Sequence, residues 1–348
     1  MAEALLYRHI VVKDAPTPHL PLLQHTLSTK RRPDGASASA WTRKITVKTS
    51  LPDAVDLRAP YLRGLRDVIL LCPNLESFCI CGQPYGNPET TGNILRALPD
   101  HLRMCAWADL GEIVYSDLFR DVCSFFSMLE HLRLRRFWSY DTEQVILTLP
   151  RLRSLSFPSC ITIPRIDQWD LPSLVWVEIS VESAAWLEDL ESFFFEHGKK
   201  LEFLQLVPGD LEPSFGAHRL LYIEIPLNFF RCFPLLSCFS VDPSWMWLAT
   251  IKDEISADPH ENLTTLHILR PDPRHGPNNS CSEFVRSFFV AHQNLCPKLK
   301  VISFTIYGEY IVVPMFYPWF CSGVKPTREE LAKLGDGFSF VLIDHAYS

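Results

Sequence analysis

One apolar pattern recurs along the chain: a leucine followed by apolar residues three and five positions later. In five places a proline stands two residues before that leucine, as in CPNLESFCI (72–80) and LPRLRSLSF (149–157). Side chains alternate between the two faces of a strand, so each segment predicts a short strand with one apolar face and one outward face. The nine leading leucines are Leu75, Leu102, Leu129, Leu152, Leu174, Leu201, Leu236, Leu263 and Leu299.

The spacing of these leucines indicates a repeat protein. Neighbouring leucines lie between 22 residues (Leu152 to Leu174) and 36 residues (Leu263 to Leu299) apart, and most spacings fall in the range typical of leucine-rich repeats. The intervening segments 117–128, 186–194 and 284–295 carry apolar residues at helical spacing. We therefore expect an α/β fold, an irregular leucine-rich-repeat solenoid or horseshoe, with parallel strands on the concave face and helices on the convex face.

The repeats predict three regions of chain. Residues 1–50 form an N-terminal cap segment, residues 51–310 the leucine-rich-repeat domain and residues 311–348 a C-terminal cap. Strands are expected at residues 9–12, around Ile45 and at residues 338–342. A series of prolines between the first two strands disfavours helix there, and Pro60 is expected to interrupt a helix that follows LPDAV (51–55).

The C-P-x-L-x-x-L-x-L units resemble the cysteine-containing leucine-rich repeats of F-box proteins. The segments LLYRHIVV (5–12), PLLQHTL (21–27) and WTRKITV (41–47) are similar to the region that follows the F-box in the large fungal F-box-like family. The resemblance implies a substrate-receptor arm of an SCF-type ubiquitin ligase. An F-box itself is not evident, so we expect a Skp-type adaptor to bind only a longer form that carries one. The alternative is a protein-interaction scaffold without a ligase role.

One feature of the usual repeat is missing. That repeat carries Asn or Cys eight residues after the leading leucine, where the side chain hydrogen-bonds the turn backbone. Cys160 alone fits this position among the nine units. The turns must therefore be stabilised by other groups.

Composition narrows the function further. Hydrophobic residues make up 47% and charged residues 21%, values typical of a folded domain, and the formal net charge is −7. The cations Lys30, Arg31 and Arg32 form the one basic cluster, so no nucleic-acid partner is expected. Neither a signal peptide nor a long apolar span is visible, which predicts a soluble cytoplasmic or nuclear protein without membrane contact and with its 11 cysteines reduced.

Motifs for catalysis and metal binding are weak. A nucleophile elbow and a phosphate loop are both absent. Cys72, Cys79 and Cys81 are close in sequence, as are His292 and Cys296, but neither group predicts the four converging ligands that zinc prefers. We expect no enzyme activity, no metal and no cofactor; an enzyme or a zinc protein is the remote alternative.

The strand register predicts where a protein partner binds. Extended solenoids recognise partners through their surfaces, and interface hot spots favour Trp, Tyr and Arg. Trp176 and Phe203 are large aromatic residues at outward positions of neighbouring strands. The predicted protein-binding concave face consists of Met104, His131, Arg133, Arg135, Trp176, Glu178, Phe203, Gln205, Asp242 and His267.

Overall fold

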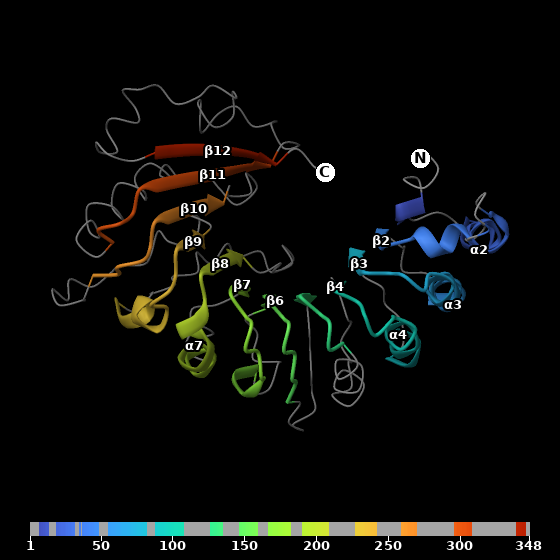
Figure 1. Cartoon of the computed structure of the whole chain (residues 1–348), viewed down its shortest axis with the longest axis horizontal. Helices are drawn as coiled ribbons and strands as arrows, with labels where there is room; N and C mark the ends of the chain where they lie inside the picture. Colours follow the sequence, from blue (N-terminus) through green and yellow to red (C-terminus); the bar gives the residue numbers. More distant parts are fainter. Residues whose placement is uncertain are drawn as a thin grey trace. The chain divides into compact units, whose positions relative to one another are not determined.

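The structure is a computed structural model of the chain, shown in Figure 1, and it forms two compact units, Met1–Leu174 and Val175–Ser348. It describes residues 7–13, 19–31, 35, 37–48, 55–81, 88–107, 126–134, 146–158, 166–181, 190–208, 227–241, 259–269, 296–307 and 339–345. The helix predicted at residues 284–295 lies outside these residues, and so does the one predicted at 117–128, apart from residues 126–128.

Six described strands of the N-terminal unit pair side by side in chain order, and every pair is parallel. They are β1 (His9–Lys13), β2 (Lys44–Lys48), β3 (Ser77–Cys81), β4 (Met104–Trp107), β5 (His131–Leu134) and β6 (Ser154–Pro158). The predicted strands near residues 9 and 45 are confirmed. The N-terminal 50 residues therefore contribute two strands in the same parallel sense as the repeats; the cap boundaries at residues 50 and 310 remain a prediction.

Helices α2 (His19–Thr29), α3 (Val55–Leu71) and α4 (Pro88–Leu95) cover one face of these strands, with short 3₁₀ turns η1 (Ala38–Trp41) and η2 (Ile166–Gln168). Two expectations about proline were wrong. The interval after β1 contains α2, because Pro21 stands in the first turn, where no intrahelical N–H partner is needed. Helix α3 continues through Pro60, which forgoes one hydrogen bond near the start of a 17-residue helix.

The C-terminal unit repeats the arrangement. Its described strands are β7 (Trp176–Val181), β8 (Phe203–Pro208), β9 (Cys238–Val241), β10 (Thr265–Leu269), β11 (Val301–Tyr307) and β12 (Ser339–His345), again parallel neighbours in chain order. Helix α7 (Glu191–His197) and the 3₁₀ turns η3 (Gly198–Lys200) and η5 (Leu227–Cys232) precede strands of this unit. Helix α7 covers the second half of the predicted helix at 186–194, and its Phe193 and Phe194 are buried.

The leading leucines form the core of both units. All nine are buried, from 0% exposed for most of them to 8% exposed for Leu299. The apolar residues three and five positions later are buried wherever their side chains are described, as for Phe78 and Ile80. Burying one such side chain stabilises the fold by roughly 1.5–3 kcal/mol. The repeat pattern therefore encodes a continuous apolar layer between the strands and the helices.

The prolines of the repeats lie in turns. The N–H of Leu75 donates to the carbonyl oxygen of Cys72 at 3.2 Å, which closes a four-residue turn with Pro73 in its second position. Proline is favoured there because its fixed φ suits that position. The same hydrogen bond recurs in other units, for example from Leu152 to Leu149 at 3.1 Å. Proline thus ends the preceding segment and also sets the turn that leads into each strand.

Side chains just before the leading leucine bond to the turn of the preceding repeat. Asn74 Nδ2 donates to the carbonyl oxygen of Ala40 at 2.8 Å, and Ser173 Oγ donates to that of Pro150 at 2.7 Å. Asn262 Nδ2 donates to the carbonyl oxygen of Pro234 at 2.7 Å. Each bond joins the turn of one repeat to the turn of the repeat before it. These bonds stabilise the turns that lead into the strands, at the opposite end from the Asn or Cys position of the usual repeat.

In the repeat of Leu263, buried His260 joins the turn to the preceding repeat. Its Nε2 lies 2.8 Å from the carbonyl oxygen of Phe233 in the preceding repeat, and its Nδ1 lies 3.0 Å from the backbone N of Leu263. The imidazole therefore donates through Nε2 and accepts through Nδ1. It takes the place of the carbonyl group that accepts from the leading leucine in the other turns.

Candidate functional site

The strands of the N-terminal unit turn their outward side chains away from the helices, and we call this surface the N-terminal strand face. Its described members are His9, Val11, Lys44, Thr46, Lys48, Ser77, Cys79, Met104, Ala106, His131, Arg133, Ser154 and Ser156. The strand register aligns Met104 with His131 and Ala106 with Arg133 on neighbouring strands. His131 and Arg133 are exposed, whereas Met104 is half-buried. Three predicted site residues therefore lie together on β4 and β5.

The equivalent surface of the C-terminal unit is the C-terminal strand face, formed by Trp176, Glu178, Phe203, Gln205, Cys238, Ser240, Thr265 and His267. The rings of Trp176 and Phe203 stack with their centroids 5.4 Å apart and their planes 17° apart. Both side chains are half-buried, so each keeps part of its ring in solvent. Stacking fixes the two rings relative to each other before any partner arrives.

Glu178 differs from the expectation of an exposed side chain. It is buried, at 8% exposure, and its Oε2 accepts a hydrogen bond of 3.0 Å from Gln205 Nε2. Strand pairing explains the contact, because Glu178 and Gln205 are register partners on β7 and β8. The carboxylate therefore orders the surface beside the stacked rings. His267 is half-buried on β10, and its register partner on β9 is Ser240.

Arg135 and Asp242, also predicted for the site, lie outside the described residues. Conversely, sequence reasoning missed Lys44 and Lys48, which are exposed at both ends of β2. The alternation of apolar and polar residues in KITVK (44–48) indicates both lysines as outward residues, because Ile45 and Val47 are the buried ones. The strand was predicted, but its outward residues were not included in the site.

A row of alternating charge runs along the turns that lead into the strands of the N-terminal unit. The row consists of Arg43, Glu76, Arg103, Glu130 and Arg153, each one residue after a leading position. Arg43 Nε lies 3.3 Å from Glu76 Oε1, and Arg103 Nε donates to Glu130 Oε1 at 3.0 Å. The hydrogen bond from Arg103 lowers the pKa of the Glu130 carboxyl below its ordinary value. We call this row the charge ladder.

The backbone explains why these charges meet. The carbonyl oxygens of the first four ladder residues each accept two N–H groups of the next repeat; Glu76, for example, accepts from Arg103 at 2.9 Å and from Met104 at 3.0 Å. Because these paired bonds repeat from turn to turn, side chains at the ladder position are brought into register between neighbouring repeats. The ladder acids are thereby held by ladder arginines.

Buried cysteines in the described part of the chain offer little reactive thiolate. Burial raises the pKa of Cys72 to about 11 and that of Cys105 to about 12. Cys72, Cys105, Cys232, Cys238 and Cys296 are free thiols among the described residues. Within that same part of the chain, no group of three or more His, Cys, Asp or Glu side chains is arranged to hold a metal ion. Cys81 has no described side chain, and His292 lies outside the described residues.

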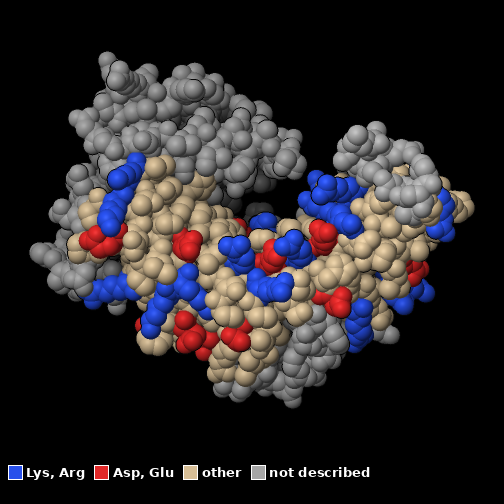
Figure 2. Space-filling view, viewed as in Figure 1, with Lys and Arg blue, Asp and Glu red and all other residues tan. Residues whose placement is uncertain are grey.

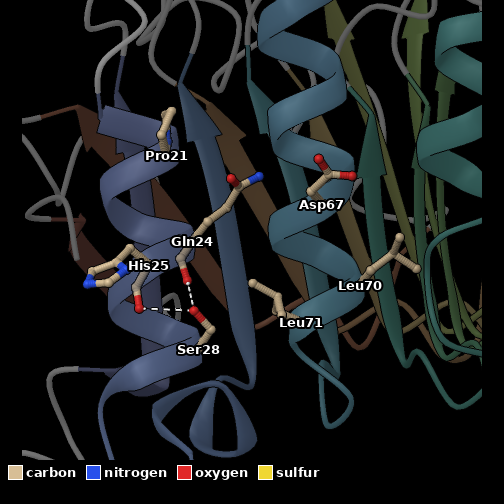
Figure 3. A pocket seen from close by; sticks show the side chains of 7 residues that line it. All are labelled: Pro21, Gln24, His25, Ser28, Asp67, Leu70 and Leu71. Carbon is tan, nitrogen blue, oxygen red and sulfur yellow. Dashed lines mark hydrogen bonds between the residues drawn. The ribbon is translucent and has the colours of Figure 1, made fainter.

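A shallow groove lies between α2 and α3 on the helix side of the N-terminal unit (Figure 3). Ser28 Oγ donates to the backbone carbonyl oxygens of Gln24 and His25. Gln24 Nε2 in turn donates to the carbonyl oxygen of Gly64 at 3.2 Å, which joins the two helices. Ser28 and Gln24 therefore direct their donors to backbone carbonyl oxygens of α2 and α3. It is lined by Pro21, Gln24, His25, Ser28, Asp67, Leu70 and Leu71.

Parallel strands in chain order, one buried leading leucine per repeat and helices on one face define an α/β leucine-rich-repeat solenoid. Among the described helices, none has the length and apolar character needed to cross a membrane. No protein-family model matches the chain, and neither does any curated protein.

Several solved structures are similar to this chain at low identity. The leucine-rich repeat-containing protein LegL7 from Legionella pneumophila is 13% identical, with 97% of this chain and 91% of that chain covered and a TM-score of 0.47. A protein from Bacteroides fragilis is 12% identical, with 95% and 73% covered and a TM-score of 0.39. A structure of the yeast Rad7 and Elc1 complex is matched at 12% identity, with 98% and 92% covered and a TM-score of 0.29.

Proposed function

We propose that this chain is a protein-binding module that holds its partner on the strand faces and has no catalytic role. The stacked pair Trp176 and Phe203 carries the proposal. Two large aromatic rings that remain partly in solvent gain free energy when a partner covers them, and aromatic residues dominate interface hot spots. Because the rings are already stacked and flanked by the Glu178–Gln205 hydrogen bond, little side-chain freedom is lost on binding.

The test compares two aromatic surfaces of the same unit. Trp176→Ala and Phe203→Ala change the strand face, whereas Phe195→Ala removes a ring on α7 that is 68% exposed. Partners are recovered by affinity purification with mass spectrometry, and binding of the main recovered protein is then measured with purified chain. We expect the strand-face variants to weaken binding at least tenfold, which is about 1.4 kcal/mol, and Phe195→Ala to leave it unchanged. The reverse order of effects contradicts the proposal.

A finer proposal concerns the assembly that the module serves. The C-P-x-L units and the similarity of residues 5–47 to fungal F-box-like proteins support a substrate-receptor-like arm of an SCF-type ubiquitin ligase. A ligase-independent interaction scaffold is the second candidate. A pull-down with purified Skp adaptor bears on the choice: stoichiometric binding by residues 1–348 supports the ligase arm and reveals a docking module within this chain. Its absence, the result expected where no F-box is evident, means that residues 1–348 alone act without the adaptor.

A further inference from the structure

A row of half-buried side chains crosses the strands of the C-terminal unit. It consists of the first outward residue of each strand from β7 to β11, and we call it the strand band: Trp176, Phe203, Cys238, Thr265 and Val301. The strand pairings place each member in register with the next. Each side chain keeps part of its surface in solvent. Four strand spacings of about 4.8 Å make the band about 19 Å long.

The strand band is uncharged and changes from large to small side chains along its length. The stacked rings of Trp176 and Phe203 lie on β7 and β8, and short side chains follow on β9 to β11. Burial raises the pKa of Cys238 to about 11, so its thiol carries no charge at neutral pH. The band therefore suits an apolar partner surface that has its larger side chains over β9 to β11.

A line of residues borders the strand band at the turns, and we call it the rim. It holds the residue just before each band member: Val175, Glu202, Ser237, Thr264 and Lys300. Paired hydrogen bonds join each rim residue to the next repeat; the carbonyl oxygen of Glu202, for example, accepts from the N–H of Ser237 at 2.9 Å and from that of Cys238 at 3.1 Å. Glu202 and Lys300 are the charged rim residues, and both are exposed.

The two rim charges are too far apart to pair with each other. Three strand spacings, about 14 Å, separate β8 from β11. Within the described part of the chain, neither Glu202 nor Lys300 has an ion-pair partner. In the N-terminal unit the corresponding charges stand on neighbouring repeats and do pair, as Arg103 does with Glu130. Figure 2 shows acidic and basic side chains interspersed on the visible face of that unit.

An α-helix matches the spacing of the strand band better than an extended segment does. A helix presents one side of each turn about every 5.4 Å, close to the strand spacing of about 4.8 Å. An extended segment presents side chains on one face about every 6.6 Å, so it falls out of step with the strands within a few residues. The distance of about 14 Å between the rim charges corresponds to about ten helical residues, close to three full turns.

We propose that the strand band binds an amphipathic α-helix of the partner that lies across β7 to β11. Its apolar stripe covers the band, a cationic residue reaches Glu202, and an anionic residue about ten positions away reaches Lys300. The inference rests on the proposed protein-binding function and names the structure and the charges of the bound segment.

The test uses the full chain and synthetic peptides of about 16 residues, long enough to cross the band as a helix. One peptide carries an apolar stripe, with Lys and Glu about ten positions apart; a shuffled peptide has the same composition without the stripe. In fluorescence anisotropy we expect the striped peptide to bind at least tenfold more tightly. Equal binding of the shuffled peptide, or of an extended peptide with alternating apolar residues, overturns the proposal. Self-association of the chain that Trp176→Ala abolishes, measured by sedimentation velocity, assigns the band to a second copy and overturns it as well.

A change of rim charge should switch the preferred peptide. Glu202→Lys leaves two cations at the rim, so this variant should bind a striped peptide with Glu at both positions at least fivefold more tightly than the Lys and Glu peptide. The control Glu196→Lys makes the same charge change at an exposed position of α7 and should keep the preference of the unchanged chain for the Lys and Glu peptide. The same switch in both variants shows that net charge alone acts, and the proposal fails.

The length of the contact is tested on β10. Thr265→Arg adds a large side chain to the band two strands from Phe203, and we expect at least tenfold weaker binding of the striped peptide. Phe195→Arg adds the same group to α7, where the ring is 68% exposed, and should have no effect. Unchanged binding in Thr265→Arg means that the peptide does not lie across the strands and refutes the helix. Circular dichroism confirms that each variant is folded.

The two proposals fail in different ways. If Trp176→Ala and Phe203→Ala weaken binding of the recovered partner while Thr265→Arg and Glu202→Lys leave it unchanged, strand-face recognition stands and the helix is refuted. If Phe195→Ala weakens partner binding and none of the strand-face changes does, the proposed function itself is wrong.

Discussion

Replacing His260 tests whether one buried side chain joins two repeats. In His260→Ala, the N–H of Leu263 loses its acceptor and the carbonyl oxygen of Phe233 loses its donor, and both hydrogen bonds are buried. Leaving a buried polar group unsatisfied costs about 1–3 kcal/mol. Since a water molecule can enter the space left by the imidazole and recover part of the loss, we expect the variant to be less stable by about 2–4 kcal/mol.

Hydrogen exchange measures this loss where it arises. A repeat array opens locally, so the exchange rate of the Leu263 amide reports the stability of that repeat better than a single global transition does. A loss of about 3 kcal/mol corresponds to roughly a hundredfold faster exchange, because about 1.4 kcal/mol is a factor of ten. The amide of Leu236 in the preceding repeat, which donates to Phe233 at 3.0 Å, should be affected less.

Two further variants control this experiment. Glu261→Ala changes an exposed neighbour whose carboxylate lies 3.4 Å from Lys298 Nζ, and such a surface pair contributes little. His260→Gln keeps one acceptor and one donor, so it should recover part of the lost protection. If His260→Ala exchanges at the same rate as Glu261→Ala, the imidazole does not join the two repeats and the reasoning is refuted.

Three shorter predictions concern packing, charge and thiols. A Cβ at Gly198 would collide with the backbone carbonyl oxygen of Cys232, so Gly198→Ala should lower stability by about 1–3 kcal/mol in thermal unfolding. In the control Gly64→Ala, the added Cβ meets only the flexible Leu20 side chain, and stability should not change. Because the pKa of Glu130 is lowered in the folded chain, its carboxylate stabilises the fold above the ordinary glutamate pKa, and this stability is lost as pH falls through the folded pKa. In Arg103→Gln this contribution is missing, so the midpoint of acid unfolding should move toward neutral pH. An unchanged midpoint contradicts the ladder contact. Because burial raises the pKa of Cys72 and Cys296 to about 11, both should react slowly with iodoacetamide at pH 8 and faster as pH rises, while the denatured chain should give close to 11 free thiols by mass spectrometry.

The strands and their faces were predictable because the repeat constrains them strongly. A one-residue shift of register would turn every apolar side chain of a strand to the other face, so the spacing of Leu75, Phe78 and Ile80 allows a single solution. For the same reason Trp176 and Phe203 were predicted at outward positions of neighbouring strands, and the structure pairs them in register. Glu178 was not predictable as buried, because its cover comes from Gln205 on the neighbouring strand.

The N-terminal repeats were harder to recognise because their leading positions lack leucine. The strand register places Thr42 two residues before Lys44 exactly as Leu75 stands before Ser77, and Thr42 is fully buried like a leading leucine. A polar residue at this position breaks the sequence pattern without breaking the packing. Proline caused the other errors, since its effect depends on whether it stands in the first turn of a helix, as Pro21 does.

The fold does not constrain the residue types at its outward positions, and the two strand faces carry different residue types there. Leucines at the leading positions fix the register, but the residue that follows each of them and the outward strand residues make no contribution to the apolar layer. In the N-terminal unit the acids of these positions stand at the turns, where Arg43 and Arg103 hold them, and the exposed cations stand on the strands. In the C-terminal unit the outward positions hold a stacked aromatic pair.

Charge selects partners and speeds their approach, whereas aromatic contact slows their release. Trp176→Ala should therefore act on the release of a partner: we expect its dissociation rate to rise and its association rate to stay nearly unchanged, as measured by surface plasmon resonance. A change confined to the association rate would contradict this role of the stacked pair.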